Sequence, residues 1–274
     1  MALQEPYPGL DEILESLGEA GLRVSGIEAS EGAAGNISVC IGWPLEVRRQ
    51  FPLEEDLDLP VAAPALGGHV LIVTGSGRRL RDVKLDPVAN LGAVVLDGDG
   101  RAGKLYTSTR RLFAMLTSEF NSHLAVHNAL VAQTGTNFHA LIHAQPPNLV
   151  YLSHIPAYGE EKIFNQRLLR WEPETIVNLP EGIGVLPFIL PGSAALMEAN
   201  VAKLLAHRIV VWGKHGVMAR SDLSVTRAAD RIDYAETAAR FEYMDLACGG
   251  RGEGLTPEEL RAVVKAFGVE TTLV

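Results

Sequence analysis

The chain has 274 residues, of which 47% are hydrophobic and 21% are charged. These values are typical of a folded globular protein and argue against a disordered or repeat architecture. The formal net charge of −9 argues against a nucleic acid partner, because phosphate backbones need clustered lysines and arginines, which this sequence scatters. No apolar stretch approaches the ~18 residues of a membrane span, and the first nine residues do not resemble a secretion signal. We therefore expect one domain over residues 1–274, in the cytoplasm and without a membrane partner.

The predicted secondary structure mixes helices and strands. Periodicity and capping residues predict helices over residues 10–20, 118–132, 146–154, 160–170, 193–206, 226–247 and 257–267. Short apolar runs predict strands within residues 30–42 and over 69–74, 93–96, 138–143 and 208–212, with a hairpin turn at 97–100, an extended segment at 175–189 and a surface excursion at 43–67. Because strands and helices do not alternate strictly, we expect an α/β sandwich with a mixed or largely antiparallel central sheet covered by helices.

The cysteine content excludes two classes of protein. Cys40 and Cys248 stand far apart and form no Cys-x-x-Cys pair. Neither a disulfide framework nor a thiolate zinc site is therefore indicated. We expect two reduced and buried thiols.

Two histidines end predicted buried strands. His143 closes the run 138–143, and His215 follows the run 208–212. A neutral imidazole at a strand end can ligate a metal, because the sheet fixes its direction while the next loop leaves room for substrate. Gln145 lies two residues after His143, so both side chains point to one face of a continuing strand. A histidine at a strand end can equally be a purely structural residue, and an amide oxygen is a poor ligand for zinc.

A third segment combines two hydroxyls with a carboxylate. Thr117, Ser118 and Glu119 stand where a helical pattern begins, and the unpaired N–H groups of a helix start favour an anion. The alternative is a plain helix cap. His123 and His127 follow Glu119 at intervals of four residues, which places them on one helix face. This spacing can bind a metal but more often lies on a surface or a subunit interface.

Two loops of small residues offer exposed backbone donors. Gly35 and Asn36 form one turn, and Gly75, Ser76 and Gly77 follow a predicted strand. Such loops can bind an anion, although each taken alone is also an ordinary turn. Neither loop matches a P-loop or the dinucleotide-binding glycine pattern, so a nucleotide is not indicated.

Taken together, these segments resemble the class II aldolase and adducin family. The matching stretches are Gly35–Ser38, Val73–Gly77, Leu116–Glu119, Ile142–His143, Pro180–Pro187, Val211–Gly216 and Phe267–Val269. They span nearly the whole chain in the order of the family. No single stretch is specific, but the ordered set is.

The resemblance implies an enzyme that uses zinc or another divalent metal. It would cleave a ketose 1-phosphate such as L-rhamnulose 1-phosphate to dihydroxyacetone phosphate and an aldehyde, as a homotetramer with active sites between subunits. The resemblance implies that Glu119 moves the proton at the carbanion carbon, which calls for a carboxyl pKa raised by burial. It also implies that Glu174 of a neighbouring subunit acts at the aldehyde end of the substrate. Metal would be held by His143, Gln145 and His215, and phosphate by Gly35, Asn36, Ser76, Gly77, Thr117 and Ser118.

Two positions depart from the family pattern. Gln145 stands where the family usually has a histidine, and Ala33 where it usually has an asparagine. Gln145, Glu119 or His154 is therefore the candidate to complete the metal site. Two alternatives stay open: an epimerase or decarboxylase of the same fold, and an adducin-like binding protein that has lost the metal. Glu119 with two histidines favours an enzyme, whereas Gln145 and Ala33 favour the binding protein.

Overall fold

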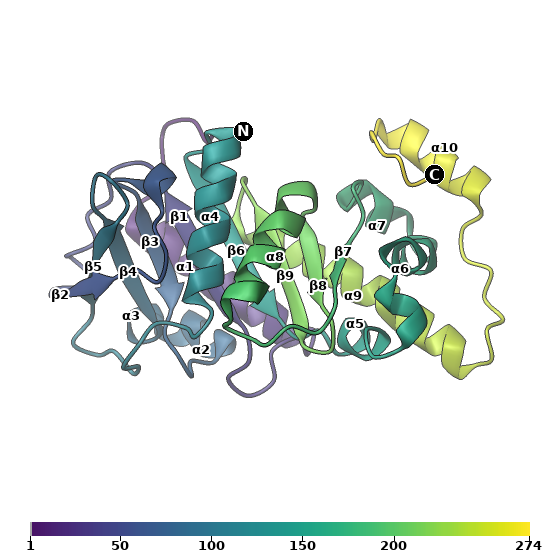
Figure 1. Ribbon diagram of the computed structural model, residues 1–274, viewed down its shortest axis with the longest axis horizontal. Coiled ribbons are helices and arrows are strands. Elements are labelled where there is room, and N and C mark those ends of the chain that lie inside the picture. The colour runs from purple at the N-terminus through teal and green to yellow at the C-terminus, as the bar shows by residue number, and fades with distance from the viewer. Residues whose placement is uncertain (1) are drawn as a thin grey trace.

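A single nine-stranded sheet organises the computed structural model (Figure 1), which describes residues 2–274. The strand order is β2-β5-β4-β3-β1-β6-β9-β8-β7. Within the described residues only β7 and β8 pair in parallel, and the other neighbouring strands are antiparallel. This architecture confirms the predicted α/β class with a largely antiparallel sheet. The strands are β1 (Asn36–Ile41), β2 (Leu53–Asp58), β3 (Val70–Thr74), β4 (Leu91–Leu96), β5 (Ala102–Thr107), β6 (Phe138–Ala144), β7 (Gly184–Leu186), β8 (Ile209–Trp212) and β9 (Gly216–Ser221).

Helices cover both faces of this sheet (Figure 1). Helices α4 and α8 lie in front of the sheet in that view, and α1 and α9 lie behind it. No helix within residues 2–274 is long and apolar enough to cross a membrane. The helices are α1 (Leu10–Gly26), α2 (Leu80–Leu85), α3 (Pro87–Asn90), α4 (Phe120–Thr134), α5 (Pro147–Leu152), α6 (Glu161–Leu168), α7 (Pro173–Asn178), α8 (Ala194–Ala206), α9 (Val225–Ala247) and α10 (Pro257–Phe267).

Side-chain alternation along β1 and β6 separates apolar from polar residues. Ile37, Val39 and Ile41 of β1 join the apolar core under α1 and α9, and Phe138, Ala140, Ile142 and Ala144 of β6 do the same. The residues between them must point to the other face, because successive side chains of a strand alternate. Polar residues of both strands therefore lie beneath α4.

Strand direction brings the candidate residues together. Strand β1 pairs antiparallel with both β3 and β6, so its first residues lie beside the last residues of those strands. Asn36 is directly opposite His143 in this register. The loop at 75–77 follows β3, and the β8–β9 turn adds His215 on the far side of β6. One end of the sheet thus collects segments that are far apart in the sequence.

Three segments differ from the sequence prediction. Residues 173–178 form helix α7 rather than extended chain, because Pro173 at its first position pre-sets the helical φ angle. The excursion at 43–67 contains strand β2, whose mostly exposed residues lack an apolar pattern. That strand pairs with β5 and carries ion pairs from Glu54 to Lys104 and from Glu55 to Arg111. Cys248 is exposed, although Cys40 is buried as predicted.

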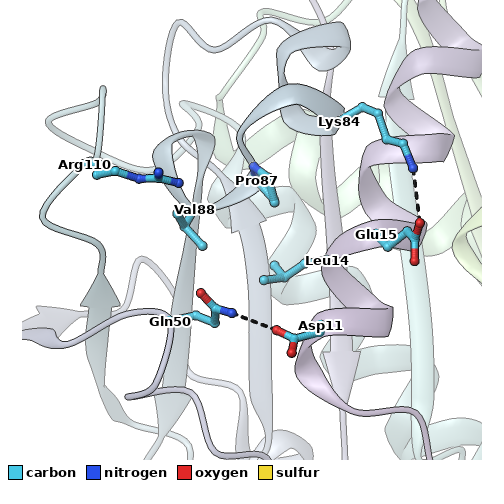
Figure 2. A pocket seen from close by; sticks show the side chains of 8 residues that line it. All are labelled: Asp11, Leu14, Glu15, Gln50, Lys84, Pro87, Val88 and Arg110. Carbon is cyan, nitrogen blue, oxygen red and sulfur yellow. Dashed lines mark hydrogen bonds and ion pairs between the residues drawn. The ribbon is translucent and has the colours of Figure 1, made fainter.

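Helix α1 continues to Gly26 instead of ending near residue 20. Its glycines at 18 and 21 allow α2 to approach: a Cβ at Gly21 would lie 2.4 Å from the carbonyl oxygen of Leu80. Figure 2 shows the hollow of about 300 Å³ beside this contact, where Gln50 bonds Asp11 (2.7 Å) and Lys84 pairs with Glu15 (3.4 Å). These contacts hold the turn at Gln50 and helix α2 against α1.

Candidate active site

Glu119, His143 and His215 converge at the polar end of the sheet. One potential ligand atom from each lies within 4.8 Å of the others. His143 Nε2 is 3.6 Å from Glu119 Oε2, and His215 Nε2 is 3.8 Å from Glu119 Oε1. The two imidazole centroids are 4.9 Å apart. Glu119 and His143 are buried, with 4% and 2% of their surface exposed. This convergence joins the start of α4, the end of β6 and the turn between β8 and β9.

Contacts on the side away from Glu119 fix the orientation of the His143 ring. Its Nδ1 lies 2.8 Å from the carbonyl oxygen of Val217, and its ring stacks on Trp212 at 4.6 Å. A carbonyl oxygen only accepts hydrogen bonds, so Nδ1 carries the proton. Nε2, the other ring nitrogen, therefore faces Glu119. A backbone carbonyl behind the ligating imidazole is the usual support of a protein metal site.

His215 sits on a strained and tightly packed turn. Lys214 before it has φ +63°, and a Cβ on Gly216 after it would lie 2.4 Å from the carbonyl oxygen of Ala144. Among the described residues no partner satisfies its buried Nδ1. Burial lowers the pKa of His215, and the neighbouring His143 lowers it further. A neutral imidazole is the form that binds a metal.

Glu119 occupies the N-cap position of α4, but its side chain makes no capping hydrogen bond. The structure thus contradicts the plain-cap alternative for this residue. Its Oε2 instead accepts a hydrogen bond of 2.9 Å from Asn36 Nδ2. Burial raises the pKa of the Glu119 carboxyl, but His143, the Asn36 hydrogen bond and two further imidazoles together outweigh it, so the net shift is downward. The expectation of a raised pKa was therefore wrong for this arrangement.

A cavity of about 230 Å³ opens beside these three residues. It is lined by Ala33–Asn36, Gly75–Arg78, Thr117–Glu119, His143, Gln145, Pro191 and His215. All six predicted phosphate-binding residues and all three predicted metal ligands thus line one cavity. Gly35 adopts φ +86°, and a Cβ there would lie 2.9 Å from the carbonyl oxygen of His143, so the turn requires glycine.

Two other predicted residues lie elsewhere. His154 is exposed in the segment after α5 and does not line the cavity, so it is not brought to the metal-ligand cluster. Glu174 is exposed on α7, outside the cavity of its own chain.

Arg78 is a site residue that the sequence analysis did not name. It is the sole lysine or arginine among the described residues lining the cavity, and its Nε is buried without a hydrogen-bond partner. Its position directly after Gly75, Ser76 and Gly77 was the available signal. Local arginines are what an acidic protein needs to hold an anionic substrate.

The favoured interpretation of His123 and His127, a surface or a subunit interface, was wrong. Both side chains are fully buried, with 0% exposed. They face the sheet, where Ser38 lies 2.6 Å from His123 Nδ1 and 2.7 Å from His127 Nε2. The four-residue spacing identified the shared helix face correctly but not what that face contacts.

Comparison with known proteins agrees with this geometry. The model of the class II aldolase and adducin N-terminal domain matches residues 15–243. Rhamnulose-1-phosphate aldolase from Klebsiella pneumoniae (strain 342) is 33% identical over 207 residues, which are 76% of this chain and 74% of that protein. Rhamnulose-1-phosphate aldolase from Escherichia fergusonii is 32% identical over 221 residues, which are 81% of this chain and 77% of that protein.

Solved structures show the same fold. A sugar-phosphate aldolase from Thermotoga maritima superposes with a TM-score of 0.75 at 25% identity, covering 89% of this chain and 99% of that one. An L-fuculose 1-phosphate aldolase superposes with a TM-score of 0.57 at 17% identity, covering 97% of this chain and all of that one. The chain belongs to the class II aldolase and adducin family.

Proposed function

We propose that the protein is a metal-dependent aldolase that cleaves a ketose 1-phosphate, such as L-rhamnulose 1-phosphate, to dihydroxyacetone phosphate and an aldehyde. One observation carries this proposal: Glu119, His143 and His215 converge beside a cavity lined by two glycine-containing loops and a helix start. The relatives named rhamnulose-1-phosphate aldolase support the substrate class. We further propose that residues 1–274 act as one domain.

The donor set fits a divalent metal, for which zinc is our first choice. Two imidazoles and one carboxylate offer a nitrogen and oxygen set that suits zinc. The buried and unpartnered Nδ1 of His215 shows that its ring lacks a full set of partners within the described chain. Gln145 lines the same cavity and offers a further oxygen. A bound metal would polarise the carbonyl and hydroxyl oxygens of the substrate and stabilise the negative charge that develops there.

Glu119 would move the proton at the carbon that becomes a carbanion. The lowered pKa keeps its carboxylate ionised at neutral pH, ready to take a proton from the hydroxymethyl carbon of dihydroxyacetone phosphate in the direction of bond formation. In the direction of cleavage the hydroxyl beside the breaking bond loses its proton as the aldehyde carbonyl forms, and protonated Glu119 gives one proton to the carbanion carbon, so that the protons balance. Asn36 holds one carboxylate oxygen, so the carboxylate has a defined direction.

The phosphate of the substrate would lie on the loops at 35–36 and 75–77 and on Thr117 and Ser118. Ser76, Gly77 and Ser118 are exposed to the cavity side, and backbone N–H groups there can receive phosphate oxygens. Arg78 supplies the only cationic side chain among the described lining residues. Because the Nε of Arg78 has no partner among residues 2–274, its guanidinium can neutralise a phosphate at this position.

We propose a homotetramer with active sites between subunits. Glu174 is exposed and outside its own cavity, so it can act on substrate only in a second copy. Large apolar side chains are exposed on the segments next to the lining residues Thr117 and Pro191: Met115 at 70%, Phe188 at 56% and Leu190 at 67%. Met115 accepts a hydrogen bond from Ser76 N through its carbonyl oxygen, and Pro191 lines the cavity. Exposed apolar groups of this kind are typical of a subunit contact.

Proton exchange tests the proposal directly. Zinc-loaded protein is incubated with dihydroxyacetone phosphate in D₂O, with and without a chelator, and deuterium at the hydroxymethyl carbon is measured. We expect exchange that the chelator abolishes and that Glu119→Gln lowers by ~10²–10⁴. Absence of exchange with zinc bound would refute the aldolase and favour a binding protein. Analysis of products from sugar phosphates separates the aldolase from an epimerase or decarboxylase.

A further inference from the structure

A buried chain of hydrogen bonds begins at Glu119 and leads away from the cavity. Asn36 Nδ2 donates to Glu119 Oε2 at 2.9 Å, and Asn36 Oδ1 contacts His123 Nε2. His123 Nδ1 lies 2.6 Å from the hydroxyl oxygen of Ser38. Ser38 and His123 are 0% exposed and Asn36 is 6% exposed.

The chain continues for two more bonds. The hydroxyl of Ser38 also lies 2.7 Å from His127 Nε2, and His127 Nδ1 lies 2.8 Å from His139 Nδ1. Nothing in the described residues bonds the buried Nε2 of His139. We call Asn36, His123, Ser38, His127 and His139 the histidine chain.

The geometry of a helix lying on a sheet explains why these groups meet. Four residues of α4 rise about 6 Å, and two residues of β1 advance about 6.7 Å. His123 and His127 on α4 therefore match the spacing of Asn36 and Ser38 on β1. His139 lies on the same face of β6, the strand that pairs with β1.

Each imidazole of the histidine chain carries one proton. Burial lowers the pKa of His123 to about 4 and that of His139 to about 3, and it lowers the pKa of His127 well below the usual range. All three rings are therefore neutral at pH 7. A neutral imidazole has one donor nitrogen and one acceptor nitrogen, so the direction of one bond fixes that of the next.

The carboxylate end fixes the direction of all the bonds. The Glu119 oxygen accepts the hydrogen bond from Asn36 Nδ2 at 2.9 Å, so the amide oxygen of Asn36 faces His123, whose Nε2 it contacts. His123 then donates from Nε2 and accepts at Nδ1 from the hydroxyl of Ser38. The Ser38 oxygen in turn accepts from His127 Nε2, and His127 Nδ1 accepts from His139 Nδ1. The His139 end of the series places no constraint on the direction of the bonds, because His139 Nε2 has no partner among the described residues.

We propose that the histidine chain is a one-way series of hydrogen bonds that holds the amide of Asn36 in one orientation and thereby positions the carboxylate of Glu119. His123, Ser38, His127 and His139 are then positioning residues, which act on the reaction through Asn36. A reversed chain would turn the amide oxygen of Asn36 toward the Glu119 carboxylate, where two acceptors repel. This inference rests on the proposed function for its effect on rate, but the directions of the bonds do not.

Locating the imidazole protons is the first test, and it needs no substrate. Neutron diffraction or the ¹⁵N chemical shifts of the histidine side chains, measured on the full chain at pH 7, distinguish the two tautomers. We expect the proton on Nε2 in His123 and His127 and on Nδ1 in His139. Protons on Nδ1 of His123 and His127 would reverse the series and overturn the proposal.

A matched pair of serine variants is the second test. Ser38→Ala removes the central link, and Ser122→Ala removes a hydroxyl that is equally buried but has no partner among the described residues. We expect Ser38→Ala to lower the rate of deuterium exchange about tenfold, the size of one hydrogen bond, with the KM for dihydroxyacetone phosphate changed less than about twofold. Ser122→Ala should alter neither. Equal losses in both variants would indicate a general packing effect and contradict the proposal.

A combined variant shows whether the effect passes through Asn36. Once Asn36→Ala has cut the histidine chain from Glu119, adding Ser38→Ala should lower the exchange rate no further. Additive losses would overturn the proposal. If the wild-type protein shows no exchange at all, the proposed function fails, while the proton positions still decide whether the one-way series exists.

Discussion

Five buried or half-buried histidines extend from the cavity into the contact between α4 and the sheet, and they divide into two groups. His143 and His215 direct ring nitrogens toward the cavity and Glu119. His123 and His127 both bond to Ser38 beneath α4, and His127 also bonds directly to His139. The residue type is the same in both groups, so the difference in role comes from what saturates the ring nitrogens. A lone pair left free beside a cavity makes a candidate ligand, whereas a lone pair already bonded makes a structural or positioning residue.

The largest expected effect is a loss of folding stability in acid, caused by the buried group His123, His127 and His139. The pKa values of His123 and His139 are lowered to about 4 and about 3 in the folded protein, whereas in the unfolded chain they are about 6.5. Between these values the unfolded state binds more protons, so stability is full above pH ~6.5 and falls as the pH decreases. The slope is about 1.4 kcal/mol per pH unit for each histidine.

Urea unfolding between pH 7 and pH 5, with a chelator present so that metal loss adds nothing, measures this slope. His139→Gln should reduce it by the share of one histidine. An unfolding free energy that stays constant from pH 7 to pH 5 would contradict the neutral, buried state of these rings.

The second prediction separates the two groups by metal binding. His143→Ala should weaken zinc binding more than ~100-fold, because losing a ligand costs more than losing a partner behind it. His139→Ala, which removes a buried imidazole of the other group, should leave the zinc affinity within about threefold. Competition with a chromophoric chelator measures both affinities, and comparable losses in the two variants would refute the division.

Gln145→His adds a third imidazole to the candidate metal ligands His143 and His215. Gln145 lines the cavity beside His143 and His215, and an imidazole is a stronger ligand for zinc than an amide oxygen. We expect the zinc affinity to rise by roughly 10–100-fold. The same chelator competition detects the change. An unchanged affinity would mean that residue 145 does not face the metal.

The parts of the site that depend on local sequence could be predicted. Neighbouring residues in the sequence predict the glycine loop after β3 and the polar start of α4. Short apolar runs predict the strand ends at His143 and His215. The pairing of Asn36 with His143 depends on sheet register, which links residues 107 positions apart. It required the resemblance to a family or the structure itself.

The second group of histidines could not be predicted for a physical reason. A spacing of four residues places side chains on one face of a helix, but it does not say whether water or a sheet covers that face. Three polar side chains on α4 looked like a solvated face, and only their hydrogen bonds to β1 and β6 make burial tolerable. Helix α7 was missed similarly, because six residues are too few to show a helical period.

The smallest expected effect concerns the charge that Arg78 adds to the cavity lining. Arg78 carries the single cationic side chain among the described lining residues, and its Nε has no partner. If it neutralises the substrate phosphate, Arg78→Gln should raise the KM for a sugar phosphate about tenfold while kcat changes little, because a phosphate distant from the reacting carbon is bound equally in ground and transition states. Arg78→Lys keeps the charge but loses the planar donor pair, so its KM should lie between those of the wild-type protein and Arg78→Gln. Zinc affinity should not change in either variant, since Arg78 is not one of the clustered ligand residues. A fall in kcat at constant KM would instead assign Arg78 to the reacting end of the substrate, on the side of Glu119.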